Sequence, residues 1–199
     1  MKITQTIEAH VLGLAVGLVL VLVSQTTGSA QSAGQPPKAG TPGPGNMSTN
    51  FTFIPKADAE ALMKGTSGDR PARVMNIAHG ANLGAFILHL EQRKGAQPAQ
   101  SFYHSEVSEL YYVIRGEGTA LLGGELENPI WDDPNSDGIK QVRGPSVNGT
   151  MKNARAQKWS PGDIIMVSAG VPHSIGWDIT TTADILRVAV DPKRSLQLK

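Results

Sequence analysis

The sequence contains no cysteine, so no disulfide can cross-link the domain and a metal would have to be bound through nitrogen and oxygen atoms. The sequence also has no large excess of either charge, because 18 Lys and Arg residues and 17 Asp and Glu residues give a formal net charge of +1. Since no basic patch stands out, we exclude nucleic acid as the main partner. Helix-like periodicity is scarce, whereas 22 glycines and 13 prolines favour an all-β chain rich in turns.

A long hydrophobic run is missing too. The apolar stretch VLGLAVGLVLVLV covers only residues 11–23, and a membrane span needs roughly 20 apolar residues. The small residues Gly28 and Ala30 follow it, as an export peptidase prefers. We therefore predict a signal peptide over residues 1–30, a secreted or periplasmic protein, and no stable membrane span after cleavage. Glu8 in the leading region leaves an uncleaved anchor open as the alternative.

The rest of the chain divides into a linker and one domain. Residues 31–50 are rich in Gly, Pro, Ser and Gln and predict a disordered linker, and residues 51–199 are long enough for one globular domain. The pattern KADAEALMKG predicts one short helix over residues 56–65. Short β-rich runs bounded by Gly, Pro and Asp predict strands over 73–78, 84–92, 109–116, 118–124, 163–170, 173–177 and 184–190. Many short strands with tight turns indicate a sandwich or a barrel.

One segment, residues 125–159, interrupts this rhythm. It is too long for a hairpin loop, and long connections of this kind are usually functional or partly ordered. Trp131 and Trp159 stand near its two ends. We expect the segment to pack back onto the domain as a lid.

Two short stretches carry the residues that point to chemistry. In YHSEVSELYYVIRGEG, residues 103–118, four residues separate His104 from Glu109, and strand alternation places Tyr111 on the same face as the carboxylate. In SPGDIIMVSAGVPHSIGW, residues 160–177, His173 follows a Gly-containing turn and begins a new strand.

These two stretches resemble the paired motifs of the cupins, which are written roughly H-x-H-x4-E-x6-G and P-G-x5-P-x-G-x2-H-x3-N. The resemblance covers about residues 84–190, and both motif pieces occur in the right order. It implies a jelly-roll β-barrel with one short N-terminal helix and a long inter-motif insertion. It also implies that His104, Glu109 and His173 bind a divalent metal inside the barrel. By family analogy we expect a homodimer.

The chain departs from the cupin pattern at several positions. Phe102 stands where the family has its first histidine, Ser168 replaces a proline, and Trp177 replaces an asparagine. What remains is two histidines and one carboxylate, a set typical of non-haem Fe(II) oxygenases, although Mn(II), Zn(II) or Ni(II) could occupy it. We favour Fe or Mn. Phe102 and Trp177 are then expected to form an apolar wall that suits a small organic substrate.

Three further residues have alternative roles or positions. Tyr111 shares the face of Glu109 and is the candidate catalytic residue, as a hydroxyl that orients substrate or donates a proton; a plain core aromatic is the alternative. Glu106 could replace the missing ligand, but its place in a turn favours solvent exposure. His89 alternates with the apolar residues of its strand, so we expect it to point away from the metal, at the surface or an interface.

Three functions are compatible with these observations. The first is an exported, metal-dependent cupin enzyme of the oxidoreductase class, similar to dioxygenases, which acts on a small organic substrate. The second is a cupin that binds metal or a small ligand without turnover. The third is a metal-free isomerase or epimerase in which His104 acts as the base.

Overall fold

The computed structural model describes residues 51–77 and 80–199. The predicted signal peptide (1–30) and linker (31–50) lie outside this part of the chain, and the described residues belong to one compact unit. None of the helices in the described ranges has the length and hydrophobicity needed to cross a bilayer.

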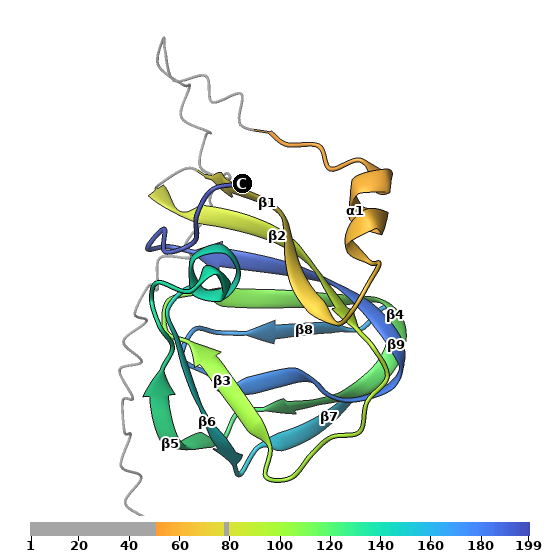
Figure 1. Cartoon of the computed structure of the whole chain (residues 1–199), viewed down its shortest axis with the longest axis vertical. Coiled ribbons are helices and arrows are strands. Elements are labelled where there is room, and N and C mark those ends of the chain that lie inside the picture. The colour runs from red at the N-terminus through yellow and green to blue at the C-terminus, as the bar shows by residue number, and fades with distance from the viewer. Residues whose placement is uncertain (1–50, 78–79) are drawn as a thin grey trace, which may run out of the picture. The chain divides into compact units, whose positions relative to one another are not determined.

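Within the described residues the chain is mostly strand, which confirms the predicted all-β class (Figure 1). The elements are α1 (Lys56–Leu62), β1 (Gly68–Asn76), β2 (Asn82–Leu90), β3 (Gln100–His104), β4 (Ser108–Leu122), β5 (Glu125–Trp131), the π-helical turn η2 (Ile139–Arg143), β6 (Ser146–Lys152), β7 (Arg155–Trp159), β8 (Ile164–Val167) and β9 (His173–Asp191). The predicted helix thus forms, and it ends just before Gly65, whose φ of 90° favours glycine.

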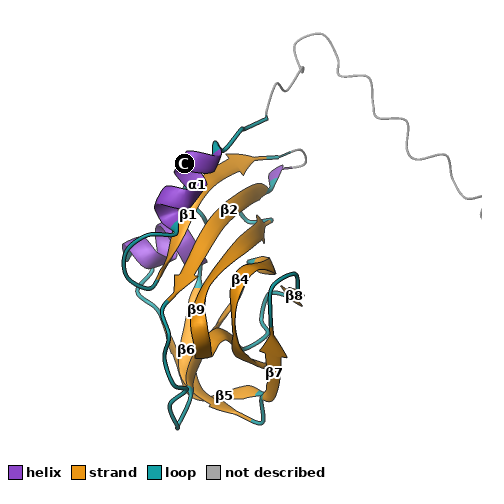
Figure 2. Cartoon of the chain, turned by 90° about the vertical axis from the view of Figure 1, so that its right-hand side faces the viewer, coloured by secondary structure: helices purple, strands orange, loops and turns teal. Residues whose placement is uncertain are grey.

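The strands form one antiparallel sheet that curls into a jelly-roll barrel (Figures 1 and 2). Neighbouring strands follow the order β1-β2-β9-β3-β6-β5, and β4 pairs with β7, β8 and β9. The long strands β4 and β9 pair with each other from Ser108 opposite Val190 to Leu122 opposite His173. Because β9 also pairs with β2 and β3, and β4 with β7 and β8, these two strands join both groups of strands into one barrel.

The sequence predicted two shorter strands in place of each of these long ones. The β4–β9 register shifts several times between Val113 and Leu121, and these bulges let the paired strands bend without ending. At Gly116 φ is 87°, and a Cβ atom would lie 2.4 Å from Ala183 Cα. Gly116 therefore marks a bend inside a strand and does not mark a turn between two strands.

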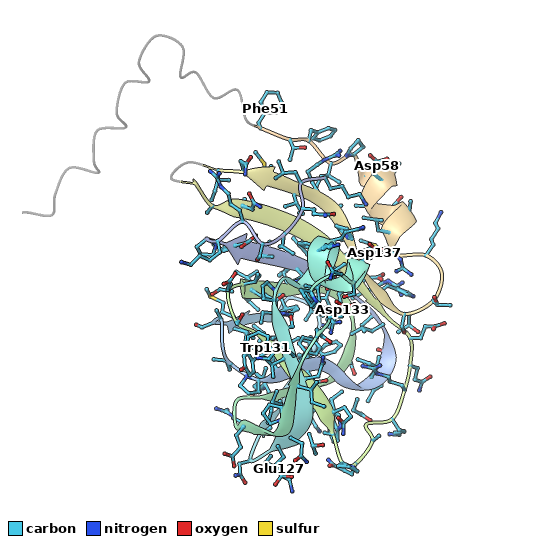
Figure 3. The ribbon with its side chains drawn as sticks, turned by 60° about the vertical axis from the view of Figure 1, so that its left-hand side comes forward. Phe51, Asp58, Glu127, Trp131, Asp133 and Asp137 are labelled. Carbon is cyan, nitrogen blue, oxygen red and sulfur yellow. The ribbon has the colours of Figure 1, made fainter. Side chains whose placement is uncertain are left out.

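The segment 125–159 is also more regular than expected. It contributes β5, η2, β6 and β7 to the described structure, so most of it belongs to the barrel. Trp159 is buried, and its indole Nε1 donates a hydrogen bond to Ile175 O at 3.0 Å. Trp131, labelled in Figure 3, stays 63% exposed, so the expectation that it packs onto the domain is wrong. Within this segment Gly138, Val142 and Arg143, in or next to η2, line the interior cavity.

Apolar side chains from the inward faces of the strands fill the barrel. Val113, Ile179 and Ile185 are fully buried in the larger cluster, and Phe86 is fully buried in a second one. Each such side chain contributes about 1.5–3 kcal/mol to folding. This packing gives the polar groups described below a rigid frame.

His89 differs from its predicted surface position. It does point away from the interior side of β2, but it is buried, with Nδ1 2.6 Å from Asp184 Oδ1. Asp184 lies opposite His89 in the β2–β9 register and also pairs with Arg115. The acidic partner and the arginine explain how a polar residue is buried here, and strand alternation alone could not reveal them.

Candidate metal centre

Three strands bring the two predicted histidines and the glutamate to one point. His104 is the last residue of β3, Glu109 is the second residue of β4, and His173 is the first residue of β9. His104 Nε2 lies 3.2 Å from Glu109 Oε1, and His173 Nε2 lies 3.1 Å from Glu109 Oε2. All three side chains are buried, and their ligand atoms lie within 4.8 Å of one another. Glu106 is not part of this group.

The hydrogen bonds around His104 determine which ring nitrogen carries the proton. Nδ1 lies 2.8 Å from Ser146 Oγ, and that hydroxyl donates its single hydrogen to Gly144 O at 2.8 Å. Ser146 can therefore only accept from His104, so Nδ1 is the protonated nitrogen. Burial lowers the pKa of His104, which favours the neutral ring. Its Nε2 then presents a lone pair toward Glu109.

The proton of His173 is placed by a backbone carbonyl. Its Nδ1 lies 2.9 Å from Val171 O, and a backbone carbonyl can only accept a hydrogen bond. In the neutral ring, the proton is therefore on Nδ1 and the lone pair is on Nε2. Metal-binding histidines in proteins usually have such a hydrogen-bond acceptor at the second ring nitrogen, and it fixes the ring orientation and the tautomer.

Glu109 is held in its ionised form. Burial raises its pKa, but the guanidinium of Arg187 and the two imidazoles beside it together outweigh that effect and hold the pKa well below its usual range. The centre thus combines two imidazole lone pairs and one carboxylate, which are all electron-pair donors at short mutual distances. Imidazole nitrogen together with carboxylate oxygen suits a divalent transition metal.

Arg187 is a site residue that the sequence reasoning missed. It is fully buried, donates to Glu109 Oε1, and donates to Val142 O at 2.9 Å. Its Nε lies 2.9 Å from Asp69 Oδ2 as an ion pair, and its guanidinium stacks 3.9 Å from the Phe86 ring centroid. Strand alternation in DILRVAV could have placed it inside, because it shares a face with two buried apolar residues.

Asp69, on β1, completes this charge network and was not predicted either. Burial raises its pKa to about 6, although the charge of Arg187 acts in the opposite direction. Two carboxylates thus share the single positive charge of Arg187. These charges form a chain from the partly buried Asp69 through the buried Arg187 to the buried Glu109.

Tyr111 lies beside the carboxylate, as the alternation of β4 predicted. Its hydroxyl donates to Glu109 Oε2 and lies 3.3 Å from His173 Nε2. Burial and the negative charge of Glu109 raise its pKa well above the usual range. Tyr111 is therefore protonated at ordinary pH and acts as a hydrogen-bond donor within the centre.

A cavity of about 350 Å³ opens next to these groups. Its wall is mostly apolar and includes Leu88, Leu90, Phe102, Tyr111, Val142 and Ile175, together with Asp69, Arg93 and Arg143. The Phe102 ring centroid lies 5.1 Å from those of both His104 and His173. Phe102 thus lies where an apolar wall was predicted.

Trp177 does not line this cavity, contrary to the prediction. Its indole Nε1 donates to Ala96 O at 3.1 Å, and the ring lies over Gly95, where a Cβ atom would approach it to 2.4 Å. Gly176 is buried between Ile175 and Trp177, so the simple alternation of side chains that the prediction assumed does not hold there. The ring therefore belongs to a separate apolar cluster.

Comparison with known proteins gives similarities of fold only. No protein-family model and no curated protein matches the chain. Among solved structures, a Bacillus halodurans protein matches with a TM-score of 0.41 and 11% identity, over 73% of this chain and 86% of its own. A Klebsiella pneumoniae protein with a double-stranded β-helix domain matches with a TM-score of 0.36 and 15% identity, over 74% and 93%.

A third solved structure is a proposed sugar phosphate isomerase from Acidithiobacillus ferrooxidans, with a TM-score of 0.33 and 19% identity. The match covers 54% of this chain and spans only about half (49%) of that one. Identities and TM-scores this low do not transfer an activity to the chain. Its chemistry has to be argued from its own side chains.

Proposed function

We propose that this chain is an exported cupin that binds a divalent metal and acts as a metal-dependent enzyme on a small organic substrate. One observation carries the proposal: the two buried Nε2 lone pairs face the ionised carboxylate of Glu109 at 3.1 and 3.2 Å. Two imidazole nitrogens and one carboxylate are a donor set that divalent transition metals take in proteins. The sequence motifs and the barrel point to the same family.

His104, Glu109 and His173 would hold the metal. With three protein ligands, it would offer open coordination positions and supply Lewis-acid or redox chemistry there. Fe or Mn fits this donor set, and Zn or Ni is the alternative.

The remaining residues have roles that follow from their positions. The apolar wall around Phe102 excludes water and binds the carbon skeleton of the substrate. Tyr111 is protonated and adjoins the centre, so it can orient the substrate or donate a proton to it. Arg187 fixes the position of Glu109.

The activity is tested by loading the protein anaerobically with Fe(II) or Mn(II) and screening small organic substrates for turnover, with dioxygen uptake as the first readout. We expect about one metal per chain by elemental analysis. We also expect Tyr111→Phe to keep the metal but to lower the rate about 100-fold or more, because a positioned proton donor is removed.

The outcomes separate the three functions. Stoichiometric metal without turnover across a broad screen favours a binding protein. Protein purified without chelator that holds no metal, yet isomerises a substrate, favours the metal-free enzyme with His104 as the base. Either result would replace the oxidoreductase proposal.

The proposal includes a homodimer, supported by an apolar face on the outside of the barrel. Tyr112, Ile114, Ile164, Met166 and Val190 are all at least 39% exposed and lie on the neighbouring strands β4, β8 and β9. A group of exposed apolar side chains of this kind marks an interaction surface. None of these five side chains is charged, so they do not repel one another when two copies meet on this face.

Export and dimerisation are tested together on protein produced from the full sequence. The exported form is expected to begin at Gln31 and to sediment as a dimer, and Met166→Glu is expected to sediment as a monomer with an unchanged circular dichroism spectrum. Retention of residues 1–30 in a membrane fraction would indicate the uncleaved anchor. A monomeric wild-type protein would remove the dimer from the proposal.

A further inference from the structure

Two arginines line the cavity without belonging to the metal-binding group. Arg143 is the last residue of η2, and Arg93 lies in the segment after β2. The guanidinium carbon of Arg143 is 5.4 Å from the centroid of Phe102, whose ring also contacts both imidazoles. Arg143 is therefore separated from the candidate metal ligands by a single aromatic ring.

Both guanidinium groups keep N–H donors for a ligand. Among the described residues, Arg143 has one acidic neighbour within ion-pair distance, Asp132, at 3.4 Å, and makes no hydrogen bond. Arg93 directs Nε and one terminal nitrogen to the same acceptor, Gly176 O. In contrast, the charge of Arg187 is fully engaged by Glu109 and Asp69.

The charges around the cavity favour an anionic ligand. Arg187 offsets one of the two negative charges of Asp69 and Glu109, so one negative charge is left to oppose those of Arg93 and Arg143. The two arginines, and any divalent cation at the centre, are attractive to an anion. A guanidinium matches the planar, two-oxygen geometry of a carboxylate.

The apolar side chains of the cavity wall determine the polarity and the size of the uncharged part of the ligand. Leu88, Leu90, Val142, Ile175 and the Phe102 ring offer no strong donors or acceptors. A cavity of about 350 Å³ is at the small end of the usual range for ligand sites, which is about 300–1,000 Å³.

From this arrangement we infer that the ligand is a small organic acid, with its carboxylate bound by Arg143 and Arg93 and its apolar body inside the cavity. This inference rests on the proposed function in that the cavity leads to the candidate metal ligands. The turn η2, which lies within the segment 125–159, thereby supplies the residue that determines ligand specificity.

The test uses isothermal titration calorimetry on the purified full chain with benzoate, 3-phenylpropionate and hexanoate, each compared with its amide. The amides keep the apolar body and lose the charge. We expect the wild-type protein to bind at least one acid about tenfold more tightly than its amide. Arg143→Gln should abolish that difference without weakening amide binding, and the Arg93→Gln, Arg143→Gln double variant should bind no acid.

Arg155→Gln is the matched control, because Arg155 is an exposed arginine on β7 outside the cavity wall. It should leave acid binding unchanged. Equal binding of acid and amide, a preference for acids that survives Arg143→Gln, or no binding of any acid would each overturn the inference.

Repeating the titrations after chelator treatment separates this inference from the proposed function. If elemental analysis finds no metal but acid binding still depends on Arg143, the metal proposal fails and the inference stands. If metal binds and a preference for acids remains in Arg143→Gln but disappears on chelation, the metal alone selects the acid and the inference fails.

Discussion

His173→Ala is expected to weaken the binding of a divalent cation by more than about 100-fold, because one of three ligand atoms is lost and replacement of a mere supporting partner already costs about 10–100-fold. Glu109→Gln should have an effect of similar size, since it removes the only negative charge among the ligands while keeping the side-chain shape. Competition with a chromophoric chelator measures both affinities.

Two further variants test the assignment of the three ligands. Glu106→Gln should bind metal as the wild type does, because Glu106 lies outside the group of ligand atoms. Ser146→Ala should weaken binding by about tenfold, since His104 Nδ1 loses the acceptor that fixes its tautomer. Losses of equal size in Glu106→Gln and His173→Ala would place Glu106 among the ligands and refute the three-residue centre.

Arg187→Met is expected to lower the free energy of unfolding by about 3–5 kcal/mol, because it leaves the buried carboxylate of Glu109 and the partly buried one of Asp69 without a compensating charge. Without the guanidinium, the pKa values of both carboxyl groups rise in the folded state. A carboxyl group with a raised pKa in the folded state favours folding less as the pH increases. The loss should therefore be larger at pH 8 than at pH 5, as measured by urea denaturation.

Lys152→Met provides the control for this experiment. Lys152 also pairs with a carboxylate, that of Glu127, but both side chains are about half exposed. Surface pairs of this kind contribute less than about 1 kcal/mol. A loss in Arg187→Met no larger than in Lys152→Met would show that the buried network is not needed for stability.

Much of the fold class and the three converging residues could be predicted from the sequence. The positions of His104, Glu109 and His173 come from short motifs with fixed spacing. The local backbone near a strand end determines where the residues of such a motif lie. Tyr111 follows from Glu109 by strand alternation.

Residues that act through distant partners could not be predicted in this way. Asp69 and Arg187 meet only because β1 and β9 both flank β2, which depends on the strand order. Arg143 reaches the cavity through a π-helical turn that has no clear sequence pattern. Trp177 was misplaced because a buried glycine interrupts the regular alternation of its strand.

The three candidate ligands differ in how firmly the backbone holds them. Glu109 is paired on both sides, with Val167 of β8 and Ala189 of β9. His173 is also paired on both sides, with Phe102 of β3 and Leu122 of β4, whereas His104 ends β3 and pairs on one side with Ser146 of β6. Glu109 and His173 are thus held by strands on both sides, and the His104 imidazole can adjust by a small shift of its strand end. Such a centre would tolerate cations of unequal radius, so the metal bound there would depend on the supply in its compartment as well as on the geometry of the three side chains.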